Sequence, residues 1–267
     1  MVATKKNRGA LVPASRDAVV VPPSLSEEFD RFANQYEQSA AGLSGAGWGF
    51  ISTRGAAFHY REQELENPLK VVILGFSHEF SYYTSAYDPD SMSAPACTAI
   101  GPVKMALAPP ENWPTKEAEK CHECWANAWG SSPRGRGKAC SERVRLCVIP
   151  MYPGVNIEKE EGARLRVPTT SLKAFDRLLN EVRALNEGKL AIHGYLTTIE
   201  LERDPNVVFK MNFKLIKALP EPMMKPILAK VKECQTPLFQ VFDPASTVEE
   251  SGETKPKRGG RGGRARR

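Results

Sequence analysis

Residues 69–80, "LKVVILGFSHEF", decide the fold, because an apolar run of this length that is rich in β-branched residues is typical of a buried strand. The run follows the turn residues "ENP" at 66–68. The two stretches before it, "WGFISTRG" (48–55) and "AAFHYREQEL" (56–65), alternate apolar and polar side chains. The sequence therefore predicts a series of strands here, and with them a mainly β protein.

Further strands are predicted toward the C-terminus, at "RVRLCVIP" (143–150), "LAIHGYLTTIELER" (190–203) and "NVVFKMNFKLIKAL" (206–219). A helix is predicted between the first two of these, capped by Thr170 or Ser171 and ended by Gly188. Its apolar face would be formed by Leu172, Phe175, Leu178, Leu179, Val182 and Leu185. The predicted order along the chain is several strands, an insertion, a strand, a helix and two strands. This is the element order of the five-stranded oligonucleotide-binding barrel, the OB-fold. We therefore expect an OB-like β-barrel.

We expect a folded body between two disordered, basic ends. Residues 1–25 are interpreted as a flexible arm, 26–245 as the OB-like domain, and 246–267 as an Arg/Gly-rich tail. An irregular Cys-, Pro- and Gly-rich insertion is expected at about 91–142. Two or three peripheral helices are predicted, at 24–40, after Ser171 and at 222–234.

Positive charge is concentrated at the ends of the chain. The net charge is +6 over 267 residues, yet residues 254–267 carry seven Lys or Arg and no acid, and residues 1–16 carry four and no acid. The remainder therefore has a mildly acidic balance of about −5. The Arg-Gly tail favours polyanions. With no apolar run of 18 residues and no apolar segment after the basic N-terminus, we expect neither a membrane protein nor a secreted one.

Four cysteines have the spacing of a metal site. Cys121 and Cys124 form a C-x2-C knuckle, and Cys97 and Cys140 are the natural remaining ligands. Four thiolates close a tetrahedral zinc site and leave no position for catalysis, so we expect a structural Zn²⁺ that orders the insertion. His122 or Cys147 as a replacement ligand, an iron–sulfur centre and a redox dithiol pair are the alternatives.

Basic and aromatic residues surround this cysteine cluster. Single-stranded nucleic acid is bound by cations that follow the phosphates and by rings on which the bases stack. Since Tyr82 and Tyr83 are neighbours in a strand, only one of them is expected to face a groove. The candidate rings are Tyr82, Tyr83, Tyr87, Trp125 and Trp129, and the candidate cations are Arg134, Arg136, Lys138, Arg143 and Arg145.

No catalytic motif is present among the phosphate-loop, zinc-protease and nucleophile-elbow patterns, so we expect a protein that is not an enzyme. Asp88 and Asp90 in "YDPDS" leave one alternative open, a metal-dependent nuclease or recombination factor.

The chain resembles a family of single-stranded DNA-binding proteins of tailed bacteriophages and prophages. The resemblance rests on "FISTRGAAFHYREQELENPLKVVILGF", on "YYTSAYDPD" followed by "PAC", and on "CHECWANAWGSSPRGRGKACSERVRLCVIP", which together span about residues 48–150. It implies an OB-like barrel with a zinc insertion and a location in the cytoplasm of a bacterial host. The chain departs from phage and bacterial single-strand binders in ending on "RGGRARR" rather than on an acidic tail.

Together these observations predict a protein that binds and protects single-stranded DNA, without strong sequence preference, during phage DNA replication or recombination. RNA as the ligand, and replication or recombination proteins as partners, stay open. A zinc ribbon that docks on host replication or transcription machinery is the alternative from another class.

Overall fold

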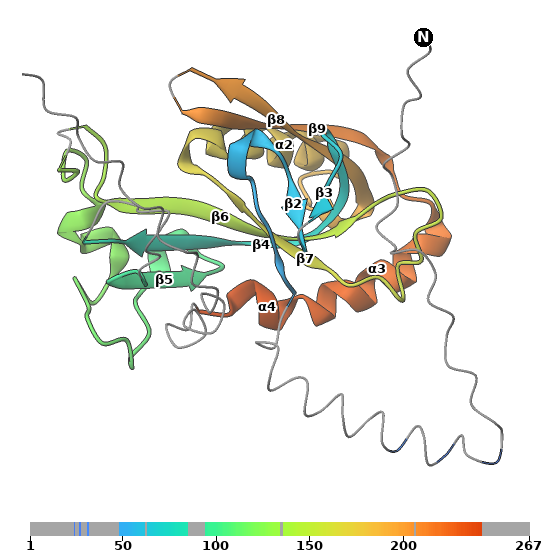
Figure 1. Cartoon of the computed structure of the whole chain (residues 1–267), viewed down its shortest axis with the longest axis horizontal. Helices are drawn as coiled ribbons and strands as arrows, with labels where there is room; N and C mark the ends of the chain where they lie inside the picture. The colour runs from blue at the N-terminus through green and yellow to red at the C-terminus, as the bar shows by residue number, and fades with distance from the viewer. Residues whose placement is uncertain are drawn as a thin grey trace, which may run out of the picture.

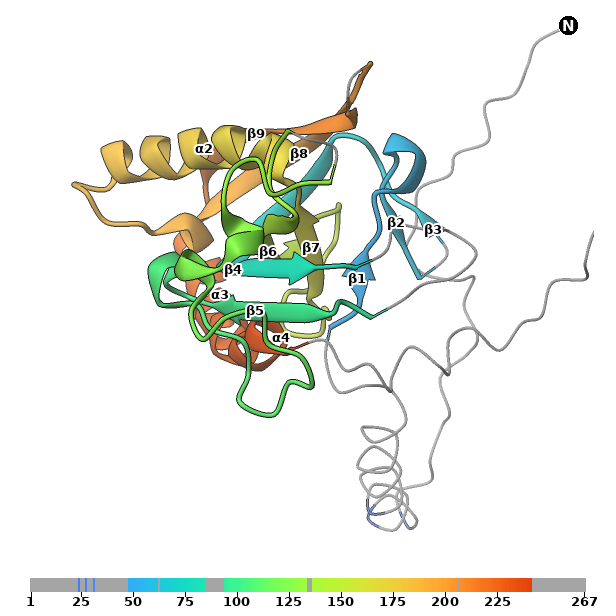
Figure 2. The same ribbon diagram turned by 90° about the vertical axis from the view of Figure 1, so that its left-hand side faces the viewer.

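The computed structural model describes residues 48–61, 63–84, 94–133, 136–205 and 207–241, with Ser24, Glu27 and Arg31 as isolated positions. The predicted N-terminal arm, the first helix and the C-terminal tail otherwise lie outside these residues. The described part is mainly β, a strongly curled half-barrel sheet with few helices (Figures 1 and 2). The mainly β class is thus confirmed. No helix within the described ranges is long and apolar enough to cross a membrane.

The main sheet has seven strands in the order β1-β7-β6-β4-β8-β9, and β5 pairs with β4 beside this path. All neighbours are antiparallel except β1 and β7, which are parallel. A separate hairpin is formed by β2 (His59–Tyr60) and β3 (Gln63–Glu64). The strands of the main sheet are β1 (Phe50–Ile51), β4 (Leu69–Tyr82), β5 (Cys97–Gly101), β6 (Cys140–Pro150), β7 (Ala163–Val167), β8 (Tyr195–Asp204) and β9 (Val208–Ala218).

Strand β4 organises the sheet, as its apolar run predicted. It pairs with β6 over almost its whole length, with β8 at its start and with β5 at its end. An irregularity between Ile73 and Gly75 shifts the alternation of its side chains. Four successive residues, Val71 to Leu74, are buried on both faces of the sheet, which is why this segment reads as a continuous apolar run.

The two faces of the sheet are covered by different helices (Figure 1). The predicted central helix is α2 (Leu172–Leu185), whose Phe175 meets Phe76 of β4 and Phe213 of β9 edge to face. Phe175 and Leu178 belong to the same buried core as residues of β4, β6 and β7. Leu185, expected on the apolar face, is 60% exposed at the end of the helix. Ser171 precedes α2, but its hydroxyl accepts a hydrogen bond from the N–H of Met211 in β9 rather than capping the helix.

The opposite face is covered by α3 (Glu221–Glu233) and α4 (Gln235–Phe239). Cys147 of β6 and Cys234 are both fully buried there, among apolar residues such as Ile149 and Ile227. Cys147 is therefore a core thiol on the side of the sheet that α3 and α4 cover.

The insertion connects β4 to β6. It contains β5 and the short 3-10 turns η3 (Lys104–Ala106), η4 (Cys121–Glu123) and η5 (Trp125–Asn127). Further 3-10 turns elsewhere are η2 (Arg54–Ala56), η6 (Thr169–Ser171) and η7 (Ile192–Gly194). The insertion has its own small core of Phe80, Ala99, Leu107 and Cys121, against which Cys140 packs. This core is too small to hold the segment together by apolar burial alone.

Candidate functional site

The four predicted metal-binding cysteines line one small cavity. Its wall contains Cys97, Cys121, Cys124 and Cys140, together with Phe80, Tyr82, Glu117 and Ala126. The cavity encloses about 20 Å³, enough for one water molecule or one ion. Residues separated by up to 43 positions in sequence thus line the same cavity.

Strand pairing brings the outer two cysteines together. Cys97, the first residue of β5, and Cys140, the first residue of β6, are both paired with Tyr82 at the end of β4. Of the other two cysteines, Cys121 is the first residue of η4 and Cys124 follows its last residue. The N–H of Cys121 donates to the carbonyl of Leu107 at 2.9 Å.

Asn127 ties this turn to the rest of the insertion. Its amide nitrogen donates to the carbonyl oxygen of Cys121 at 2.9 Å, and its amide oxygen accepts from the Lys138 ammonium, also at 2.9 Å. The knuckle is therefore held by specific polar contacts rather than by a regular helix.

The thiols influence one another electrostatically. Burial, followed by the neighbouring thiols Cys97 and Cys124, raises the pKa of Cys121 to about 11. Burial and the same kind of repulsion raise the pKa of Cys140 to about 12. A bound divalent cation would lower the pKa values of these thiols, because it stabilises thiolates.

The thiol cavity does not by itself establish a metal site. No group of three or more His, Cys, Asp or Glu side chains within the described ranges is arranged closely enough to hold an ion. His122 does not line the cavity, and its Nε2 lies 3.2 Å from Glu123 instead. Glu117, which sequence reasoning missed, does line it. Zinc binding therefore stays a prediction.

Three of the predicted rings are well exposed on the insertion and the end of β4. Trp129 is 81% exposed, Trp125 is 50% exposed and Tyr83 is 37% exposed. Tyr82 is half-buried, as expected for one of two neighbours in a strand, and meets Trp125 edge to face at 5.5 Å between centroids. The indole nitrogen of Trp125 donates to Glu117 Oε2 at 2.8 Å, so this ring is both exposed and fixed in place. Tyr87 lies outside the described residues.

The predicted cations are divided between two faces of the sheet. Arg136 is exposed and Lys138 is half-buried on the insertion, while Arg134 lies outside the described residues. Side chains alternate along β6, so Cys140 and Glu142 face the insertion whereas Arg143 and Arg145 face the other way. The predicted set of rings and cations is therefore not one surface.

Arg145 does not lie where the sequence led us to expect it. Its side chain is 3% exposed, and its Nη2 lies 2.6 Å from Oε2 of Glu79, whose side chain is 4% exposed. A second guanidinium nitrogen, Nη1, donates to the carbonyl of Gln240 at 2.5 Å. Arg145 is thus a buried ion-pair residue, because a carboxylate from the neighbouring strand neutralises it.

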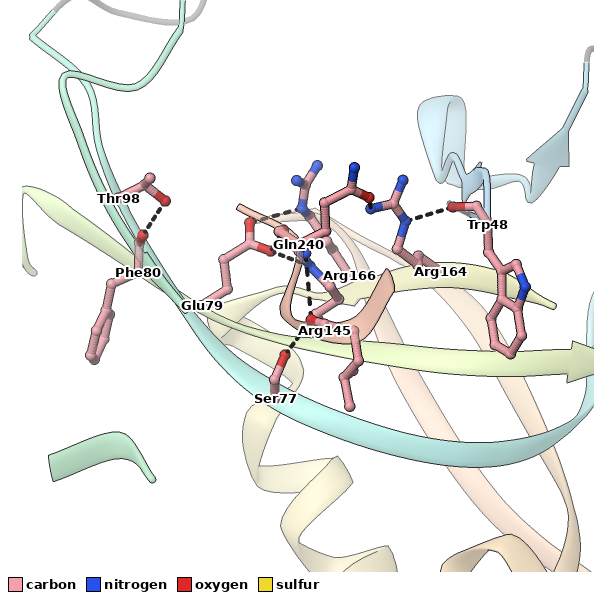
Figure 3. A network of polar contacts seen from close by, with 10 residues as sticks. Trp48, Ser77, Glu79, Phe80, Thr98, Arg145, Arg164, Arg166 and Gln240 are labelled. Carbon is pink, nitrogen blue, oxygen red and sulfur yellow. Dashed lines mark hydrogen bonds and ion pairs between the residues drawn. The ribbon is translucent and has the colours of Figure 1, made fainter. Parts of the chain in front are cut away.

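This ion pair is part of a larger network, in which Arg166 of β7 binds the second oxygen of Glu79 at 2.9 Å (Figure 3). Burial alone would raise the pKa of Glu79, but the charges of Arg166 and Arg145 hold it below its usual value. Arg164, two residues before Arg166, donates to the carbonyl of Trp48 at 2.6 Å and to the side-chain oxygen of Gln240 at 2.9 Å. We call the side chains of Phe50, Arg143, Arg145, Arg164 and Arg166 the arginine face.

Sequence reasoning missed Arg164 and Arg166, although a signal was present. "RVRL" (143–146) and "RLRV" (164–167) both alternate arginine with apolar residues. The register of β6 against β7 places Arg145 opposite Arg166, so the arginines of the two strands lie on one face.

A comparison of this chain with known protein-family models, with curated proteins and with solved structures finds no match.

Proposed function

We propose that the protein binds single-stranded DNA without catalysing a reaction on it, and that the insertion supplies the stacking surface. The observation that carries the proposal is the exposure of Trp125 and Trp129 in a segment held by specific contacts. Exposed aromatic rings offer flat faces on which unpaired bases can stack. Rings that are fixed in place lose little entropy when a base stacks on them.

Charge next to the rings supports a nucleic-acid ligand. Arg136 is exposed in the same segment as Trp129, and Lys138 lies beside Asn127 of the thiol knuckle. Cations beside stacking rings suit a strand in which phosphates and unpaired bases alternate. Protection of single strands during phage DNA replication or recombination is the role that the family resemblance suggests for such binding.

The topology supports the same proposal. Strands β4, β6, β7, β8 and β9 lie in the order β7-β6-β4-β8-β9, with α2 between the third and fourth of them along the chain. This is the strand order of an OB-fold that has been opened between its third and fifth strands, with β1 at the free edge of β7. The insertion then corresponds to the loop between the first two barrel strands, which contacts oligonucleotides in OB-folds.

A structural zinc ion fits the thiol cavity by its donor set and size. Cys97, Cys121, Cys124 and Cys140 would hold it as thiolates, and four-thiolate coordination supplies folding energy rather than chemistry. The ion would replace the apolar core that the insertion lacks. It would also lower the pKa values of Cys121 and Cys140, which the protein alone raises.

The proposal is tested by fluorescence anisotropy of a labelled oligothymidine, with the full chain and with a chain that ends at Glu253. We expect both to bind, and Trp129→Ala to weaken binding about 5- to 150-fold, since stacking of one base is worth roughly 1–3 kcal/mol. Leu185→Ala, which removes another exposed apolar side chain, at the end of α2, is the control. Binding that disappears with residues 254–267, or that Trp129→Ala leaves unchanged, would contradict the proposal.

A further inference from the structure

The arginine face lies on the side of the sheet opposite α2, at the end of α4, where Arg145 and Arg164 donate to Gln240. Arg145 and Arg166 are directly paired across β6 and β7, and Arg164 is paired with Phe50 across β7 and β1. The apolar neighbours in the same strands, Val144, Leu146, Leu165 and Val167, belong to the core under α2. The face is therefore distinct from the insertion surface on which Trp125 and Tyr82 meet.

Positive charge on this face exceeds negative charge. The hydrogen-bonded network joins three guanidinium groups, those of Arg145, Arg164 and Arg166, to one carboxylate, that of Glu79. Burial, followed by the charge of Arg145, lowers the pKa of Arg164 to about 10, so this side chain is still protonated at neutral pH. An excess of two positive charges in a partly desolvated position attracts an anion more strongly than the same charges in water.

The oxygen atoms that now satisfy Arg164 are uncharged. They are the carbonyl of Trp48 and the side-chain amide of Gln240, and Figure 3 shows Gln240 beside the guanidinium groups. Arg166 is tied to Glu79 through its Nε, and 35% of its side chain is exposed. Guanidinium groups prefer charged oxygens, which form shorter and stronger hydrogen bonds than amides do.

The ring of Phe50 holds two of these groups close together. Its centroid lies 4.2 Å from Cζ of Arg164 and 4.2 Å from Cζ of Arg166. Stacking of this kind restricts the planes of the guanidinium groups. The contact of Arg166 with Glu79 uses only its Nε, and an anion that binds Arg164 would compete with the uncharged oxygens of Trp48 and Gln240. A single guanidinium group can donate two parallel hydrogen bonds to the oxygens of one phosphate group, and two such groups lie side by side here.

We propose that the arginine face is a binding site for phosphate groups, and that in the protein's function these are phosphates of the bound single strand. The assignment of these phosphates to a bound single strand rests on the proposed function. The strand would then contact the protein on two faces, with bases stacked at the insertion and backbone held at β6 and β7.

The test uses the double variant Arg143→Gln/Arg166→Gln and a matched control, Lys173→Gln/Arg177→Gln, which removes two exposed charges from α2 on the opposite side of the sheet. Inorganic tripolyphosphate should raise the melting temperature of the unchanged protein and of the control, but not that of the double variant. Arg143→Gln alone keeps the hydrogen bonds of Glu79 to Arg145 and Arg166. If the double variant folds poorly, this single variant should still show a smaller rise in melting temperature with tripolyphosphate than the unchanged protein does.

The second measurement is the affinity for labelled oligothymidine as a function of salt. Loss of two phosphate contacts should make the slope of log K against log salt shallower by about 1.4 in the double variant and leave it unchanged in the control. Equal effects of tripolyphosphate on all variants would overturn the phosphate site. A selective tripolyphosphate effect with an unchanged salt slope would overturn its assignment to the strand. Absence of oligothymidine binding by the unchanged protein, with the tripolyphosphate effect intact, would refute the proposed function but not the site.

Discussion

Glu79→Gln tests whether the buried ion pair is as important as its geometry implies. The substitution keeps the size of the side chain but removes the charge that neutralises Arg145, and both side chains are less than 5% exposed. Removing one partner of a buried pair costs about 3–5 kcal/mol, because the other charge stays buried and unpaired. Arg166 also loses its charged partner, but 35% of its side chain is exposed, so water compensates this charge better than that of Arg145. Urea denaturation followed by circular dichroism should show the loss, and the melting temperature should fall by about 6–20 °C.

The pH dependence of the same variant gives a second check. The pKa of Glu79 in the folded protein lies below the ordinary value of 4.5, since Arg166 and Arg145 outweigh the effect of burial. A depressed pKa contributes stability that is present above the unfolded-state value and is lost as the pH falls through the folded-state value. The difference in stability between the unchanged protein and Glu79→Gln should therefore be full at neutral pH and shrink as the pH falls below 4.5.

Glu202→Gln, on the exposed side of β8, is the control and should change stability by no more than about 0.5 kcal/mol. A loss below about 1 kcal/mol in Glu79→Gln, or a difference that does not change between pH 7 and pH 3, would refute the reasoning.

Three further outcomes are expected. Elemental analysis should find one zinc per chain, and Cys121→Ser/Cys124→Ser should lose it, change the tryptophan emission and still show cooperative unfolding of the half-barrel; retention of the zinc would contradict the ligand assignment. Phe175→Ala, which empties a position that is 3% exposed between α2 and the sheet, should cost about 3–5 kcal/mol in urea denaturation, and a loss below about 1 kcal/mol would show that α2 is not part of the core. Asn127→Ala removes the hydrogen bond to the Cys121 carbonyl and should speed amide hydrogen exchange in the insertion but not in β8 and β9, whereas unchanged exchange would show that the bond does not order the knuckle.

The regular elements were predictable because their signals are local. The apolar run at 69–80 became part of β4, and the periodic apolar residues after Ser171 became α2. The predicted strand at 190–203 begins later, at Tyr195, because residues 192–194 form a 3-10 turn. That turn leaves no mark in the apolar pattern.

The position of each site residue was less predictable because it depends on strand pairing. The spacing of the four cysteines did predict their convergence, since β5 and β6 both pair with the end of β4. The burial of Arg145 was missed because its partner Glu79 lies 66 residues earlier in the chain. An arginine in a strand is usually exposed, and only the register of β4 against β6 shows that a carboxylate lies beside it.

The pairing of Tyr82 with Cys140 also determines how separable the insertion is. The chain leaves the half-barrel after Tyr82 and returns at Cys140, the residue opposite it, so the two ends of the insertion are neighbours across a ladder. Because the two ends of the insertion are already neighbours, shortening it does not strain the half-barrel. A shorter loop also loses slightly less conformational entropy when its ends are held together. Joining β4 to β6 by a two-residue hairpin turn would give a smaller protein with an intact half-barrel. We therefore expect that the insertion can be replaced as a unit while the half-barrel is kept.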